Sequence, residues 1–108
     1  MGREDNICKE SKATALTEAD IKELLDGVPQ WSLRDRTIER ELSFRNFEEA
    51  MEFVNKVAAL ANAEDHHPDI LISYNKVRLI LTTHKAGGLT CKDFILGAKI
   101  DRAGERVR

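Results

Sequence analysis

The sequence has 108 residues, 42% of them hydrophobic and 33% charged, which is typical of one globular domain. The formal net charge of −2 argues against general nucleic-acid binding, because that binding needs a basic surface that displaces counterions from phosphates. No apolar run approaches the ~18 residues of a membrane-spanning helix, and the charged N-terminus lacks the apolar segment of a signal peptide. We therefore expect a cytoplasmic protein with neither a membrane nor a nucleic acid as a direct partner.

The ends of the chain differ from its middle. Residues 1–15 show no apolar periodicity, so we expect a mobile N-terminal tail, a single domain over residues 16–101 and a C-terminal tail over residues 102–108. The two cysteines, Cys8 and Cys91, lie far apart and fit neither a disulfide framework nor a CxxC pair. No disulfide is inferred from them, and a reducing cytoplasm is the default environment.

The first half of the domain predicts a short helix and then a hairpin. Thr17 should cap the helix, with Asp20 as its partner three residues on, and the helix should end near Gly27. Residues 31–44 then alternate between apolar and polar side chains, which predicts two half-buried strands joined by a turn at residues 34–36.

The longest helix should begin after Asn46, which is a favourable N-terminal cap. Its apolar residues recur at the 3.6-residue period of a helix, which predicts a buried face. The expected main face comprises Phe47, Ala50, Met51, Val54, Val57, Ala58 and Ala61, and a second, narrower stripe comprises Phe53 and Leu60. The helix should stop before Pro68, because a residue that precedes proline avoids the helical region.

The second half of the domain predicts another hairpin, with strands over residues 69–73 and 77–83, and then a last helix. Thr90 should cap this helix with Asp93 as its partner, and the helix should fray from Arg102 onward. The predicted order is α-β-β-α-β-β-α. We expect an α+β two-layer sandwich, in which three helices cover one face of a four-stranded antiparallel sheet.

All three histidines, His66, His67 and His84, lie between residues 63 and 84, at the ends of predicted elements. Solvated or core histidines are the ordinary explanation, and a pair at a helix end also favours the C-terminal carbonyl groups. That explanation leaves His84 unaccounted for, since it lies on the strand face opposite the core leucines. Imidazole transfers protons near neutral pH, so the pattern also predicts a small acid–base site.

A metal site is another interpretation of the same residues. The three histidines could act as ligands, with Cys91 or Asp69 as a fourth. Their spacing matches no zinc signature, and adjacent side chains point apart unless the backbone bends sharply. We therefore expect no metal.

Several motifs together resemble the pterin-4a-carbinolamine dehydratase family, also known as dimerisation cofactor of a homeodomain transcription factor. The likeness extends from about residue 31 to residue 101. Its motifs are Asp65-His66-His67-Pro68-Asp69, Tyr74-Asn75-Lys76-Val77, Thr83-His84, Gly87-Gly88-Leu89-Thr90 and Asp93.

The resemblance implies dehydration of 4a-hydroxytetrahydropterin to quinonoid dihydropterin, as in tetrahydrobiopterin recycling, with no metal or cofactor. By the family pattern, His66 and His84 are the acid–base groups and His67 binds and orients the pterin. The expected substrate-binding residues are Asp65, Pro68, Thr82, Thr83, Lys85 and Asp93, although helix capping alone would also account for Asp93.

The sequence departs from the family pattern at two positions, and the resemblance also allows an alternative function. The family usually has a glutamate four residues before the first motif histidine, where this chain has Asn62, and Ile70 occupies a position that is often aromatic. A homodimer or homotetramer is expected. The alternative function is a non-catalytic dimerisation or binding module for a helical partner, for which Phe53 and Leu60 would supply an exposed contact.

Overall fold

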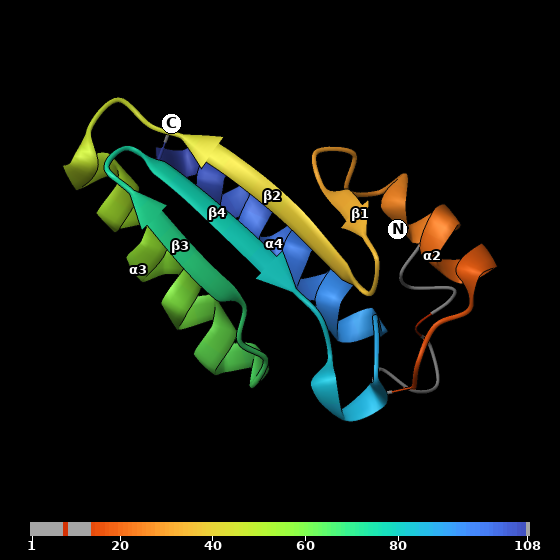
Figure 1. The fold of residues 1–108 in the computed structure, drawn as a ribbon. Helices are drawn as coiled ribbons and strands as arrows, with labels where there is room; N and C mark the ends of the chain where they lie inside the picture. Colours follow the sequence, from red (N-terminus) through yellow and green to blue (C-terminus); the bar gives the residue numbers. More distant parts are fainter. Residues whose placement is uncertain (1–7, 9–13, 108) are drawn as a thin grey trace.

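The computed structural model describes Cys8 and residues 14–107, which form a four-stranded antiparallel sheet with helices packed on it (Figure 1). The strand order is β1-β2-β4-β3. In chain order the elements are α2 (Glu18–Leu25), β1 (Ser32–Arg34), β2 (Thr37–Ser43), α3 (Phe47–Glu64), β3 (Asp69–Ser73), β4 (Lys76–Leu81), the single 3-10 turn η1 (His84–Ala86) and α4 (Cys91–Val107). In Figure 1, α3 and α4 run behind the sheet and α2 lies beside β1. The predicted α+β sandwich and its element order are confirmed.

The helix ends and the hairpins follow from local sequence. The Thr17 hydroxyl accepts a hydrogen bond from the Asp20 amide at 3.1 Å, and the Asn46 side chain accepts one from the Glu49 amide at 2.9 Å. Along β2 and β4, alternate side chains face the helices and are fully or almost fully buried. These core residues are Ile38, Leu42, Val77, Leu79 and Leu81, and they pack with Phe53 of α3 and with Leu96 and Ile100 of α4.

The buried face of α3 differs from the expected one. Phe53 is 0% exposed, whereas Phe47 is 45% exposed. The buried face combines part of the expected main face with Phe53 of the narrower stripe, whose ring centroid lies 5.0 Å from that of Phe44 just after β2. The buried residues of α3 are Ala50, Phe53, Val57 and Ala61.

Helix α4 also continues further than predicted. It extends to Val107 instead of fraying from Arg102. Gly104, in this last part of the helix, is buried where a Cβ would lie 3.1 Å from Leu42 and 3.4 Å from Phe53. The absence of a side chain there lets α4 approach the sheet and α3 closely, and this packing offsets the low helix propensity of glycine.

The expectation for the cysteines was wrong, because Cys8 and Cys91 form a disulfide with Cα atoms 5.7 Å apart. Cys8 is 6% exposed and is bonded to the first residue of α4. A backbone hydrogen bond from the Leu16 amide to the Leu89 carbonyl, at 3.0 Å, holds the chain before α2 in the same place. The rest of the predicted tail, residues 1–7 and 9–13, lies outside the described residues.

Within residues 14–107, no helix has the length and apolar character needed to cross a membrane.

Candidate active site

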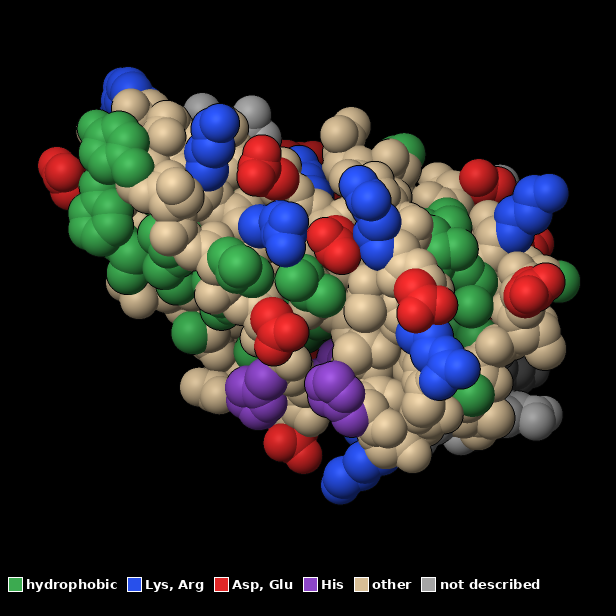
Figure 2. Space-filling model, in the orientation of Figure 1, with side chains coloured by type: hydrophobic (Ala, Val, Ile, Leu, Met, Phe, Trp, Pro, Cys, Tyr) green, Lys and Arg blue, Asp and Glu red, His purple; other side chains and the backbone are tan. Residues whose placement is uncertain are grey.

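Three segments meet at one end of the molecule: the C-terminal end of α3, the turn η1 that follows β4, and the first turn of α4 (Figure 1). They carry the three histidines. In Figure 2 the histidine side chains gather near the lower edge of the molecule, beside acidic side chains, where Figure 1 places the end of α3 and η1. Hydrogen bonds among the described residues connect these segments directly.

The turn after α3 determines where the two adjacent histidines go. Asp65 adopts the left-handed conformation, with φ 52° and ψ 43°. The His66 amide donates to the Ala61 carbonyl at 3.0 Å and the Asp65 amide donates to the Asn62 carbonyl at 3.3 Å, which is the hydrogen-bond pattern of a Schellman motif. The helix therefore ends at this turn, before Pro68 is reached. The turn sends the His66 and His67 rings to different partners.

His66 binds a buried carboxylate. Its Nε2 lies 2.5 Å from Asp93 Oδ1, and the two side chains are 10% and 0% exposed. The other carboxylate oxygen, Oδ2, accepts from the Thr90 amide at 2.9 Å and from the Thr83 hydroxyl at 2.9 Å. Asp93 therefore caps α4, as predicted, with one carboxylate oxygen and binds His66 with the other.

Two threonines complete this network. The Thr83 hydroxyl carries one hydrogen, which it gives to Asp93, so the contact of 2.8 Å between Thr83 Oγ1 and Thr90 Oγ1 uses the Thr90 hydrogen. Thr90 is 0% exposed. Among the described residues, no buried side-chain nitrogen or oxygen lacks a partner. A fully satisfied buried network of this kind holds its members in one geometry.

The Asp93 carboxylate sets the tautomer of His66. Because a carboxylate only accepts hydrogen bonds, Nε2 must carry the hydrogen, and Nδ1 of the neutral ring keeps a lone pair. A buried carboxylate that orients an imidazole in this way leaves the opposite nitrogen able to accept a proton, and the charged partner is ready to stabilise the positive ring that results.

The remaining predicted site residues lie around this centre. His67 Nε2 contacts Asn62 Oδ1 at 3.0 Å. His84 begins η1 and is exposed, as is Lys85, and the loop closes through hydrogen bonds between Thr83 and Gly88 at 3.1 and 3.3 Å. His84 thus follows directly on a residue that binds Asp93.

Three predicted substrate contacts are less directly connected to the network. Asp65 is exposed at the turn, and Pro68 is half-buried two residues after His66. The Thr82 hydroxyl donates to the Arg36 carbonyl at 2.6 Å, in the turn between β1 and β2. The Thr82 hydroxyl has therefore given its hydrogen to Arg36 and could only accept a hydrogen bond from a ligand.

The metal interpretation loses one of its proposed ligands, because the Cys91 sulfur is bonded to Cys8. In the part of the chain that the structure describes, no three His, Cys, Asp or Glu side chains are grouped as metal ligands.

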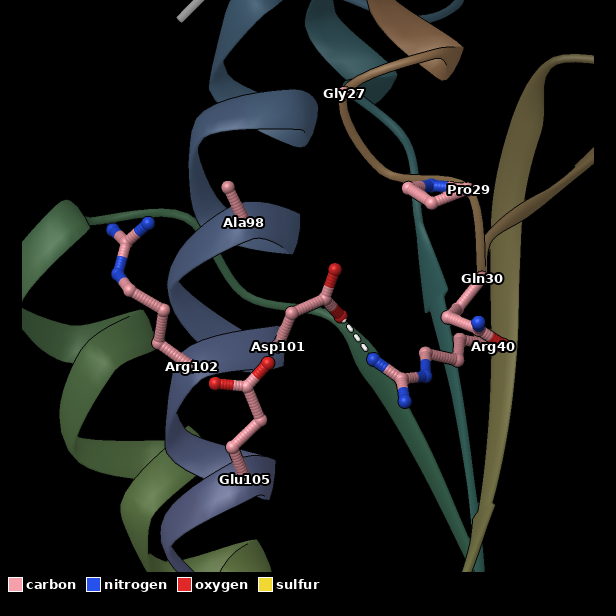
Figure 3. Close-up of a pocket in the computed structure, with 8 residues that line it drawn as sticks. All are labelled: Gly27, Pro29, Gln30, Arg40, Ala98, Asp101, Arg102 and Glu105. Carbon is pink, nitrogen blue, oxygen red and sulfur yellow. Dashed lines mark hydrogen bonds and ion pairs between the residues drawn. The ribbon is translucent and has the colours of Figure 1, made fainter. Parts of the chain in front are cut away.

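A hollow of about 630 Å³ lies elsewhere, between α4, β2 and the segment that joins α2 to β1 (Figure 3). Arg40 and Asp101 point toward each other across it and form an ion pair, and the Trp31 indole donates to the same Asp101 oxygen at 2.8 Å. Its charged groups therefore join β2 to α4. The hollow contains none of the predicted site residues.

Sequence reasoning missed the connections within the site. It predicted that Thr90 and Asp93 would form a capping pair, but it gave no sign that the same carboxylate binds His66. Asn62 was noted only as a departure from the family pattern, and its contact with His67 was not foreseen. The contact could have been predicted from the spacing, because Asn62 is a polar residue five positions before His67, on the other side of the helix end.

Known proteins with similar sequences point to one family. Residues 14–103 match the family model described as pterin 4 alpha carbinolamine dehydratase. Two curated relatives carry pterin-4-alpha-carbinolamine dehydratase in their names. One, from Picosynechococcus sp., is 54% identical over 90 residues (83% of this chain and 98% of the relative), and the other, from Chloroflexus aurantiacus, is 57% identical over 86 residues (80% and 92%).

Two solved structures are similar to the fold. A transcriptional coactivator/pterin dehydratase from Brucella melitensis has a TM-score of 0.81 and 31% identity, over 84% of this chain and 99% of that one. A pterin dehydratase-like protein identified as a RuBisCO assembly factor of the alpha-carboxysome has a TM-score of 0.57 and 17% identity, over 68% of this chain and 86% of that one. The second likeness concerns the fold alone.

Proposed function

The chain belongs to the pterin-4-alpha-carbinolamine dehydratase family, a family of hydro-lyases, and we propose that it eliminates water from a 4a-hydroxytetrahydropterin by histidine acid–base catalysis. The C4a–O bond breaks, and the hydroxyl leaves as water after it takes a proton from an acid. A base removes the proton from a ring nitrogen, and the electron pair left behind forms the C=N bond of the quinonoid dihydropterin. The reaction needs no redox step, so no electron carrier takes part.

The observation that carries this proposal is the hydrogen bond of 2.5 Å between His66 and the buried Asp93. It keeps the hydrogen on Nε2 and the lone pair on Nδ1. His66 acts as the base, because the positive ring formed on proton transfer faces a carboxylate at hydrogen-bonding distance. A positioned base of this kind contributes about 10²–10⁴-fold to a rate.

His84 acts as the acid at the leaving hydroxyl, and His67 orients the pterin. His84 is exposed and follows Thr83, so it lies beside the network that holds His66 but is free to exchange its proton with water. Asp65, Pro68, Thr82, Thr83 and Lys85 surround the bound heterocycle.

The direct test is the decay of enzymatically generated 4a-carbinolamine. We expect His66→Ala and His84→Ala to lose about 10²–10⁴-fold in kcat, the usual contribution of one acid–base group. Asn55→Ala, at an exposed position in the middle of α3, is the control and should keep wild-type activity. Decay that the wild-type protein does not accelerate would end the catalytic proposal.

The protein is also proposed to assemble as a homodimer or homotetramer. Strand β3 is an edge of the sheet, and its Leu71 and Ile72 are 46% and 42% exposed. An unpaired, apolar strand edge is a template for pairing with another strand. Sedimentation equilibrium should give at least twice the chain mass, and Leu71→Lys should shift the protein toward monomer.

A second candidate function is a binding module for a helical partner, and the Brucella relative, whose name includes transcriptional coactivator, is compatible with it. Phe53 is fully buried and cannot serve as the contact that the sequence suggested. Leu60 remains available, because it lines a hollow of about 510 Å³ between α3 and α4 together with Lys56 and Lys99. Binding of a helical peptide that survives loss of all three histidines but not Leu60→Glu would support this function.

A further inference from the structure

His67 is held by a neutral amide, whereas its neighbour His66 is held by a carboxylate. His67 Nε2 lies 3.0 Å from Asn62 Oδ1, on the last turn of α3. We propose that Asn62 is a positioning residue that fixes His67 as the tautomer with hydrogen on Nε2, so that Nδ1 accepts a hydrogen bond from the bound heterocycle. This inference rests on the proposed function for its role in the reaction, but its structural half can be measured without substrate.

The backbone of Asn62 belongs to the same turn that carries His67. The Asn62 carbonyl accepts from the amide of Asp65, at 3.3 Å, and the left-handed Asp65 then reverses the direction of the chain. The Asn62 side chain meets the His67 ring five residues later, from the other side of the turn. The turn and the side-chain contact together fix where the His67 ring lies relative to the end of α3.

The chemistry of the two partners separates the roles of the two histidines. An amide oxygen has lone pairs only, so it requires hydrogen on His67 Nε2 and leaves the lone pair on Nδ1, as Asp93 does for His66. The carboxylate of Asp93 also attracts a positively charged ring, and the Asn62 amide carries no net charge to do so. His66 is therefore equipped to take a proton. His67 is equipped to accept a hydrogen bond from an O–H or N–H of the heterocycle while it stays neutral.

Both Asn62 and His67 are exposed, so water competes for their hydrogen bond and the effect of losing it is modest. A single hydrogen bond between neutral groups corresponds to about a threefold to tenfold change in kcat/KM. The tautomer is a sharper readout, because a merely structural role for Asn62 would not set it.

The test is histidine tautomer assignment by long-range proton–nitrogen NMR of the ligand-free protein, at about pH 8, above the ordinary titration range of histidine. His67→Gln identifies the signal. We expect the Nε2–H tautomer in the wild type, a mixture of both tautomers in Asn62→Ala, and recovery of Nε2–H in Asn62→Asp, which restores an acceptor. Asn55→Ala, at the other exposed asparagine of α3, should leave the His67 signal unchanged.

The inference is overturned if His67 of the wild type carries its hydrogen on Nδ1. That tautomer would follow if the Asn62 amide nitrogen, and not its oxygen, faced the His67 ring. An unchanged tautomer in Asn62→Ala overturns it as well. In an active enzyme, Asn62→Ala should lower kcat/KM by about threefold to tenfold, and an unchanged kcat/KM despite a shifted tautomer would overturn the role in the reaction. If the wild type shows no dehydratase activity, the proposed function fails, while the NMR result still decides whether Asn62 sets the tautomer.

Discussion

Replacing the Asp93 carboxylate with an amide should switch the tautomer of His66 while keeping the protein folded. In Asp93→Asn the new side chain has nearly the same shape but only one oxygen. The Thr90 amide and the Thr83 hydroxyl both donate to Oδ2 at 2.9 Å, so the amide oxygen must stay on that side. The new NH₂ group then faces His66 Nε2 and can only donate to it. His66 must therefore place its hydrogen on Nδ1, which removes the lone pair assigned to proton transfer.

The magnitudes differ between activity and stability. Loss of a positioned base predicts a fall in kcat of about 10²–10⁴-fold for Asp93→Asn. The free energy of unfolding should fall by only about 1.5–3 kcal/mol, the contribution of a hydrogen bond to a charged group, because the amide keeps the two contacts to the threonines. Asp93→Ala should cost more stability than Asp93→Asn, since it removes the acceptor of three donors that are buried or part-buried.

The assay combines carbinolamine decay with urea unfolding and the His66 tautomer by NMR. We expect a folded Asp93→Asn protein with the hydrogen of His66 on Nδ1 and little activity. A folded variant that carries this tautomer and still has wild-type activity would refute the assignment of His66 as the base.

Three further predictions concern other parts of the fold. Asp65→Gly should raise the free energy of unfolding by about 0.5–1 kcal/mol, because glycine adopts the left-handed conformation of residue 65 without cost. Activity should fall if the Asp65 carboxylate contacts the pterin. A less stable variant would contradict the turn assignment. Cys8→Ser removes a crosslink with a sequence separation of 83, so in non-reducing buffer the free energy of unfolding should fall by up to about 4.5 kcal/mol. The difference between the variant and the wild type should vanish in a dithiol reductant. Equal denaturation midpoints of the two proteins without reductant would argue against the disulfide. Phe53→Ala should lower the free energy of unfolding, measured in urea, by about 3–5 kcal/mol, and Phe47→Ala, at an exposed position, should lower it by much less. The reverse order would contradict the burial of the α3 face that contains Phe53.

The features that the sequence predicted well are local. The caps at Thr17 and Asn46 depend on residues three positions apart, and they form as expected. The same holds for the Thr90–Asp93 pair at the start of α4. Hairpin strands were identified by alternation of apolar residues, which needs only a few neighbouring positions.

The features that escaped prediction depend on distant partners. Phe47 and Phe53 both fit an apolar helical stripe, and the one that is buried packs against residues outside the helix, Phe44 among them. Gly104 has a low helix propensity, but its contacts with the sheet and α3 keep α4 helical. The disulfide joins Cys8 and Cys91 across a sequence separation of 83, which no local pattern indicates.

The candidate site shows the same division. The resemblance suggested roles for the three histidines, and the sequence pattern placed them at the ends of predicted elements. The side chains that contact the two rings, Asp93 for His66 and Asn62 for His67, come from different helices, α4 and α3. Their identity became clear only once α3, η1 and α4 had been placed together.

The most direct test of the central claim is a crystal structure of the protein with a bound pterin. We expect the heterocycle to lie between the turn of His66 and His67 and the side chain of His84, with a hydrogen-bond donor within reach of His66 Nδ1. A pterin bound instead in the hollow beside Arg40 and Asp101, with the histidines out of contact, would contradict it.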